Sequence, residues 1–91
     1  MRTYEVVGVA EHWENGILTL SQRNRFFQGD ILEILEPGTP SFSITAQQMT
    51  DIAGLPIESA SHAMMIVHMA CPRPVKPGAF LRKVLVDKEN C

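Results

Sequence analysis

The fold is decided by the stretch QRNRFFQGDILEIL, residues 22–35, in which a polar and basic segment passes into an apolar run. Gly29 can take the positive φ that a sharp entry into a strand needs. Asp30 can accept hydrogen bonds from neighbouring backbone N–H groups and so fix the register of the apolar run. The stretch therefore predicts a loop over residues 23–28 and a strand over residues 31–35.

Upstream of this stretch, the sequence predicts a β-hairpin. Residues 4–13 are rich in valine and aromatic residues, and residues 17–22 alternate apolar with polar side chains. Asn15 and Gly16 lie between the two runs and form a strong hairpin signal. Gly8 lies within the first run and indicates a bend or bulge there.

Downstream, short strands alternate with turn signals. Three further strands are expected at residues 41–45, 64–70 and 79–86. Residues 46–49 fit either one helical turn or a continuation of the strand before them, and residues 51–54 read as a turn. Pro77 and Gly78 occupy the central positions of an expected type II turn, which begins the last strand.

Six or seven short strands, about 8–12 residues apart and with little helical periodicity, predict an all-β fold. We expect a small closed β-barrel rather than a sandwich, because closure removes the edges that so short a sheet would otherwise expose. The alternation along the strands predicts the core. Its expected members are Leu18, Leu20, Leu32, Ile34, Phe42, Ile44, Val67 and Met69.

Length and charge limit the functions that can be considered. The 91 residues suit a single domain, and a net charge of −2 gives no overall attraction to nucleic acid. A nucleic-acid role would therefore need a local basic patch. No apolar run approaches the ~18–20 residues of a membrane span, so no membrane partner is expected and the chain reads as cytoplasmic. The methionine directly before strand-like sequence and the charged end DKENC suggest a domain cut from a longer protein.

Four segments carry a resemblance to a known family. They are YEVVG at residues 4–8, QRNRF at 22–26, GDILEI at 29–34, and PVKPG with the following FLR at 74–82. With them the chain resembles, over nearly its whole length, the C-terminal domain of the collagenase-like peptidases of family U-32.

The resemblance implies both a fold and a context. The fold would be a β-barrel similar to domain two of translation elongation factors, placed after a larger catalytic domain. Relatives of that larger domain include proteins described as collagenases, which are hydrolases, and others that resemble iron–sulfur-dependent hydroxylases of RNA bases. The resemblance therefore implies that the chemistry lies in the preceding domain, which would also be a partner of this one.

Within the chain, no catalytic residue, metal site or cofactor is expected. The candidate ligands are His12, His62, His68, Cys71 and Cys91. Their spacing fits no known metal site, and two cysteines cannot provide the four ligands of an iron–sulfur cluster. Ser61 and His62 are adjacent in sequence, which prevents the ordinary geometry of a nucleophile and its base. Catalysis by this chain alone is kept as a third hypothesis only because the name of the family that it resembles says peptidase.

The candidate binding residues are Arg23, Arg25, Phe27 and Lys76. Guanidinium groups beside aromatic rings can hold phosphates and stack on bases, so a protein or RNA substrate is one possible partner. The alternative is a structural domain that docks on its own catalytic domain without a ligand. A contiguous surface of Arg23, Arg25 and Lys76 would favour substrate binding, whereas exposed Ile31, Leu35 or Phe27 would favour docking.

Overall fold

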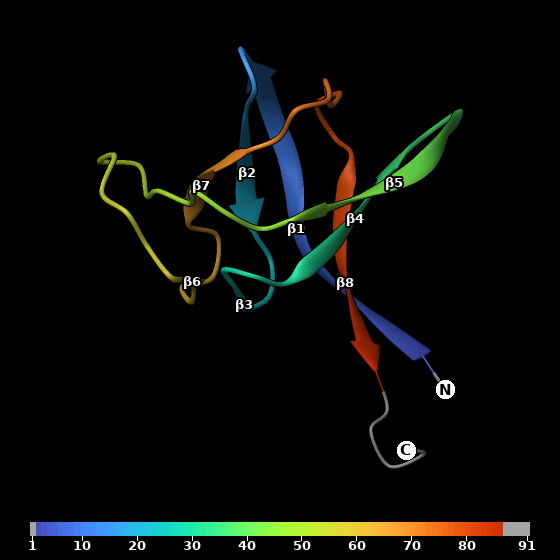
Figure 1. The fold of residues 1–91 in the computed structure, drawn as a ribbon, viewed down its shortest axis with the longest axis horizontal. Helices are drawn as coiled ribbons and strands as arrows, with labels where there is room; N and C mark the ends of the chain where they lie inside the picture. Colours follow the sequence, from blue (N-terminus) through green and yellow to red (C-terminus); the bar gives the residue numbers. More distant parts are fainter. Residues whose placement is uncertain (1, 87–91) are drawn as a thin grey trace.

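The structure is a computed structural model that describes residues 2–86 (Figure 1). In these residues it contains eight strands and no helix, which confirms the all-β prediction. The strands are β1 (Arg2–Glu14), β2 (Ile17–Gln22), β3 (Phe26–Phe27), β4 (Ile31–Glu36), β5 (Thr39–Thr45), β6 (Ser59–Ala60), β7 (Ile66–Ala70) and β8 (Phe80–Val86). None of the described segments is a helix of the length and apolar character needed to cross a membrane.

Six of these strands form one antiparallel sheet in the order β5-β4-β8-β1-β2-β7, and β3 pairs with β6 in a separate two-stranded sheet. The first and last strands, β1 and β8, are hydrogen-bonded neighbours in the middle of the large sheet (Figure 1). Long-range pairing therefore fixes the fold, because the centre of the sheet joins the two ends of the chain.

The predicted closed barrel is not confirmed, because the ladder of the large sheet is open in the part of the chain that the structure describes. The edge strands β5 and β7 are not paired with each other. Instead the segment after β5 reaches β7 through an isolated bridge, in which Thr50 and His68 exchange backbone hydrogen bonds of 2.8 and 2.9 Å. Irregular chain thus covers the edge of β7, which is another way to protect a sheet edge without closing a barrel.

The core lies between the large sheet and the segments that fold over its inner face. Six of the eight predicted members have side chains that are fully buried: Leu18, Leu20, Leu32, Ile34, Val67 and Met69. The other two, Phe42 and Ile44, are partly buried and pack against this cluster. They are less covered because β5 is an edge strand of the sheet and projects away from it (Figure 1).

Two predicted backbone features are present. Gly29 has a φ of +97°, and Asp30 Oδ2 accepts a hydrogen bond of 2.8 Å from the N–H of Phe27. Gly8 lies at a bulge, since the pairing of β1 with β8 shifts between Val6 and Gly8. Such bulges increase the twist of a long strand. The first part of β1 pairs with β8 and the second part with β2.

Candidate nucleic-acid interface

The basic segment between β2 and β4 is held at both ends by the rest of the fold. The N–H of Arg23 donates to the carbonyl of Val7 at 2.7 Å, and the N–H of Gln28 donates to the carbonyl of Glu58 at 2.8 Å. The segment also contains β3, so the prediction of a plain loop was incomplete. Phe26 is fully buried, and this anchors the segment to the core.

Phe27 points the other way, as expected for the next residue of a strand, and 46% of its surface is exposed. The Lys83 Nζ lies 5.8 Å from the centroid of the Phe27 ring and 3.6 Å from Asp30 Oδ2, and it donates a hydrogen bond of 3.3 Å to the carbonyl of Arg25. Lys83 therefore joins the basic segment from β8. We call this region the basic end: Arg23, Arg25, Phe27 and Lys83.

The two arginines of the basic end are exposed. The guanidinium of Arg23 contacts the sulfur of Met64. Among the described residues, three ion pairs occur: His12–Glu14, Arg82–Glu33 and Lys83–Asp30. Arg23 and Arg25 belong to none of these pairs, so their charges are available to a phosphate or carboxylate ligand.

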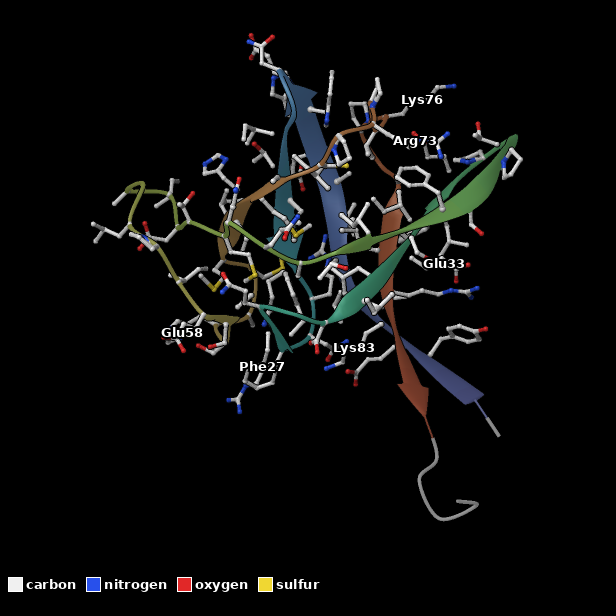
Figure 2. All side chains as sticks on the ribbon, viewed as in Figure 1. Phe27, Glu33, Glu58, Arg73, Lys76 and Lys83 are labelled. Carbon is white, nitrogen blue, oxygen red and sulfur yellow. The ribbon has the colours of Figure 1, made fainter. Side chains whose placement is uncertain are left out.

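Lys76 is not part of the basic end. Its backbone N–H donates a hydrogen bond of 2.7 Å to Glu36 Oε2, at the far end of β4 from Asp30. Six strand residues at about 3.3 Å each separate the two ends by roughly 20 Å. Lys76 instead neighbours Arg73, whose guanidinium lies 4.3 Å from the centroid of the Phe42 ring (Figure 2). The contiguous surface of Arg23, Arg25 and Lys76 that would favour substrate binding is therefore not formed, and the exposure of Phe27 and Ile31 that would favour docking is present.

Sequence reasoning did not select Lys83 as a binding residue, although adjacent strand residues such as Arg82 and Lys83 point to opposite faces. Lys83 lies opposite Leu32 in the ladder, and Arg82 lies opposite Glu33. Only this register brings Lys83 next to Asp30, which precedes β4. Alternation predicts the face of a side chain, whereas the register that selects its neighbours is a long-range property.

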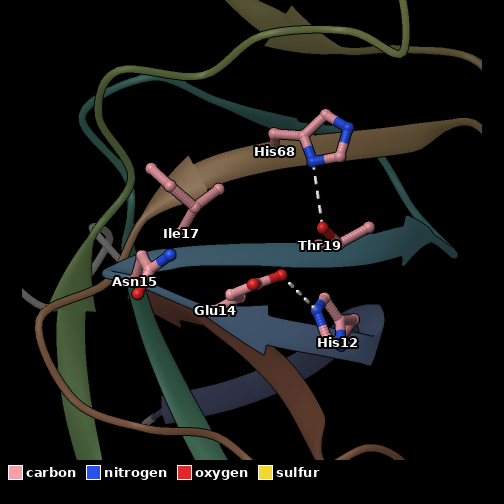
Figure 3. A pocket seen from close by; sticks show the side chains of 6 residues that line it. All are labelled: His12, Glu14, Asn15, Ile17, Thr19 and His68. Carbon is pink, nitrogen blue, oxygen red and sulfur yellow. Dashed lines mark hydrogen bonds and ion pairs between the residues drawn. The ribbon is translucent and has the colours of Figure 1, made fainter.

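A shallow hollow of about 490 Å³ lies elsewhere, over β1, β2 and β7 (Figure 3). It is lined by His12, Glu14, Asn15, Ile17, Thr19 and His68. The Oγ1 of Thr19 and the Nδ1 of His68 are 2.9 Å apart, and His12 Nε2 is 3.1 Å from Glu14 Oε1. The polar side chains of the hollow are thus largely paired with one another, and no group of three metal ligands occurs among the described residues.

The other groups with catalytic potential differ in exposure. Ser61 and His62 are exposed between β6 and β7. Cys71 is buried, and this burial raises the pKa of its thiol. A raised pKa disfavours the thiolate, which is the nucleophilic form of cysteine.

Three comparisons relate the chain to known proteins. A family model described as the peptidase family U32 C-terminal domain matches residues 2–82. The tRNA hydroxylation protein P1 of Bacillus subtilis (strain 168) is 30% identical over 83 residues, which are 89% of this chain and 20% of that protein. The chain thus spans about a fifth of the length of this relative.

Two crystal structures are also similar. Both contain the C-terminal domain of a protein from Geobacillus thermoleovorans that is assigned to the U32 peptidases. Each is 31% identical to the chain, with a TM-score of 0.83, and covers 87% of it. The chain covers 99% of one of these structures and 91% of the other.

Proposed function

Because the chain belongs to the family of peptidase U32 C-terminal domains, we propose that it is a non-catalytic accessory domain that binds RNA for a longer, RNA-modifying protein. The basic end is the binding surface of this proposal. In it, residues 1–91 form one domain at the C-terminal side of a catalytic domain, in the cytoplasm. The chemistry, together with any cofactor, belongs to that catalytic domain.

The observation that carries the proposal is the arrangement of charge at the basic end. Arg23 and Arg25 take no part in the ion pairs of the described residues, and they precede the exposed Phe27 on a segment whose backbone is fixed at both ends. Cations that neutralise phosphates and rings that stack on bases are the two elements of single-strand recognition. A fixed backbone lowers the entropic cost of presenting them.

The name of the Bacillus subtilis relative supports RNA as the ligand, since that protein is described by tRNA hydroxylation. We transfer to this chain only the class of substrate. With two or three cations available and a net charge of −2, binding by the domain alone should be weak. Its role would be to add to the affinity of the catalytic domain, as linked binding modules do.

A second candidate follows from the Geobacillus thermoleovorans structures, which are assigned to the U32 peptidases. In that case the protein would be a collagenase-like hydrolase, and the basic end would hold an acidic segment of a protein substrate. Carboxylates pair with guanidinium groups as phosphates do, so charge alone does not separate the two candidates. The exposed ring of Phe27 does separate them, because an aromatic ring can stack on a nucleic-acid base.

The proposal is tested by titrating the domain with unmodified tRNA at ~50 mM and ~200 mM salt. We expect weak binding that falls with salt, by a log–log slope of about −0.7 for each phosphate neutralised on a single strand. An acidic peptide of matched charge is titrated in parallel. Binding of the peptide with at least equal affinity would support the second candidate, and no salt-dependent binding of tRNA would contradict the first.

A further inference from the structure

The outer face of the large sheet carries a group of exposed apolar side chains, on the opposite face of β8 from Lys83 of the basic end. We call it the outer patch: Tyr4, Val6, Ile31 and Phe80, with Arg82 and Glu33 among them. The four apolar residues are between 40% and 52% exposed. They come from β1, β4 and β8, which are hydrogen-bonded neighbours, so they share one continuous surface.

The register of the three strands arranges this patch in rows. Val6 and Glu33 lie on either side of Arg82, and these three residues form the middle row. One row further along, Phe80 lies opposite the half-buried Leu35. Neighbouring strands are about 4.8 Å apart and alternate residues about 6.6 Å apart, so the rows are in contact. The patch is therefore apolar around a central pair of charges.

That central pair is already neutralised within the domain. Arg82 Nε and Nη2 both lie 2.6 Å from Glu33 Oε1, and the guanidinium stacks 3.7 Å from the centroid of the Tyr4 ring. The hydroxyl of Ser41 also donates a hydrogen bond of 2.9 Å to Glu33. These hydrogen bonds, with that from Arg82 first, lower the pKa of Glu33. The charges are thus satisfied before any partner arrives, and a partner need not supply an ionic group.

We propose that the outer patch is the surface on which the preceding catalytic domain of the same polypeptide docks, an inference that rests on the accessory role proposed above. Exposed tyrosine, phenylalanine and arginine side chains are the types enriched at the centres of protein interfaces. An RNA ligand is disfavoured here, since the one arginine of the patch is held by Glu33. An apolar, charge-compensated protein surface is the partner that fits.

Position along the chain selects the preceding domain as that partner. The similar Bacillus subtilis protein is about five times as long as the region it shares with this chain. A preceding domain would connect to the start of β1, the strand that presents Tyr4 and Val6 (Figure 1). Because the two domains would belong to one polypeptide, docking would be intramolecular. Linkage raises the effective concentration of the partner, so even a modest patch would be occupied.

Thiol labelling of the full-length protein tests this docking without RNA. Single variants Val6→Cys and Phe80→Cys are treated with a maleimide, and modification of each introduced cysteine is followed by peptide mass spectrometry, in native buffer and in denaturant. The control is Ile52→Cys, on a turn where the isoleucine is 76% exposed. Buried Cys71 serves as an internal reference for folding, because it stays protected while the domain remains folded.

We expect cysteines at positions 6 and 80 to react at least tenfold more slowly in the native protein than in denaturant, and the cysteine at position 52 to be nearly unprotected. This protection should be unchanged on tenfold dilution. Equal reactivity at the three positions would overturn the proposal. Protection lost on dilution would identify a second copy as the occupant, and protection that appears only with added tRNA would identify RNA; either result also overturns it. Because the expected result needs no tRNA, it stands apart from the test of RNA binding.

Discussion

The basic end and the outer patch contain the same types of side chain but differ in how their charges are paired. In each, a cation lies over an aromatic ring: Lys83 over Phe27 at the basic end, and Arg82 over Tyr4 in the outer patch. Arg82 is bound to Glu33 at 2.6 Å, whereas the nearest carboxylate oxygen to Lys83, on Asp30, is 3.6 Å away. The pairing, not the residue types, distinguishes a surface suited to phosphate from one suited to an apolar partner.

The difference in charge pairing also explains why the two ligands would need separate surfaces. A phosphate near Arg82 would compete with Glu33, and a protein surface over the basic end would bury arginines without partners, which is costly. The two regions lie on opposite faces of the sheet at β4. Lys83 is the register partner of Leu32, whereas Arg82 is the register partner of the next residue, Glu33. Two predictions on stability test this separation, and a third tests whether the domain is catalytic.

The largest effect should come from the core beneath both regions. Leu32 is fully buried, so Leu32→Ala should lower the free energy of unfolding by about 2–5 kcal/mol through lost burial and a residual cavity. The matched control is the adjacent residue of the outer patch. Ile31→Ala should lower the same free energy by only about 1 kcal/mol, because half of this side chain is exposed. Urea denaturation measures both, and equal losses would mean that the two faces of β4 are assigned wrongly.

A smaller effect should follow from breaking the ion pair of the outer patch. The hydrogen bonds from Arg82 and Ser41 hold the pKa of Glu33 below its ordinary value of 4.5. A carboxylate with a lowered pKa in the folded state stabilises the fold above about pH 4.5, and this contribution is lost as the pH falls through the folded pKa. Glu33→Gln should therefore be less stable than the wild type at pH 7, with the difference shrinking toward pH 3.

The measurement is the midpoint of urea unfolding at several pH values between 3 and 7. Glu58→Gln is a suitable control, since Glu58 is an exposed carboxylate without an ion pair among the described residues. If the difference in unfolding midpoint between the wild type and Glu33→Gln did not change with pH, the charge of the carboxylate would not be what stabilises this face.

The last of these predictions is that the domain alone has no peptidase activity. We expect the purified domain not to cleave gelatin or collagen peptides, because Ser61 and His62 are adjacent on an exposed turn and Cys71 is buried with a raised pKa. Neither region would then contribute a catalytic group. Cleavage that co-purifies with the folded domain and disappears in Ser61→Ala or His62→Ala would refute this expectation.

Local features of the fold could be predicted from the sequence because they depend on neighbouring residues. Strand β2 has the predicted bounds, Ile17–Gln22. Asn15 and Gly16 have the positive φ angles of their predicted hairpin turn, 53° and 81°. Six of the eight core residues predicted from period-two alternation are fully buried. These features follow from backbone preferences and from burial on one face of a sheet.

Properties that depend on distant segments could not be predicted in this way. The place of β8 between β1 and β4 determines that Lys83 joins the basic end and that Lys76 lies at the other end of β4. Closure was also overestimated, because irregular chain can protect a sheet edge as strands do. Thr50 bridges to His68 and so covers the edge of β7, where the predicted barrel would have had a paired strand.

A tRNA titration of two charge-matched double variants tests the central claim, that the basic end is the RNA-binding surface, most directly. Arg23→Ala/Arg25→Ala and Arg73→Ala/Lys76→Ala each remove two positive charges. Figure 2 shows Phe27 and Lys83 of the basic end on the other side of the domain from Arg73 and Lys76. We expect the first variant to lose most of the affinity of the wild type, with a log–log salt slope shallower by about 1.4, the contribution of two phosphates on a single strand. The second should keep the wild-type slope. Equal curves for the two variants, or a greater loss in the second, would contradict the account.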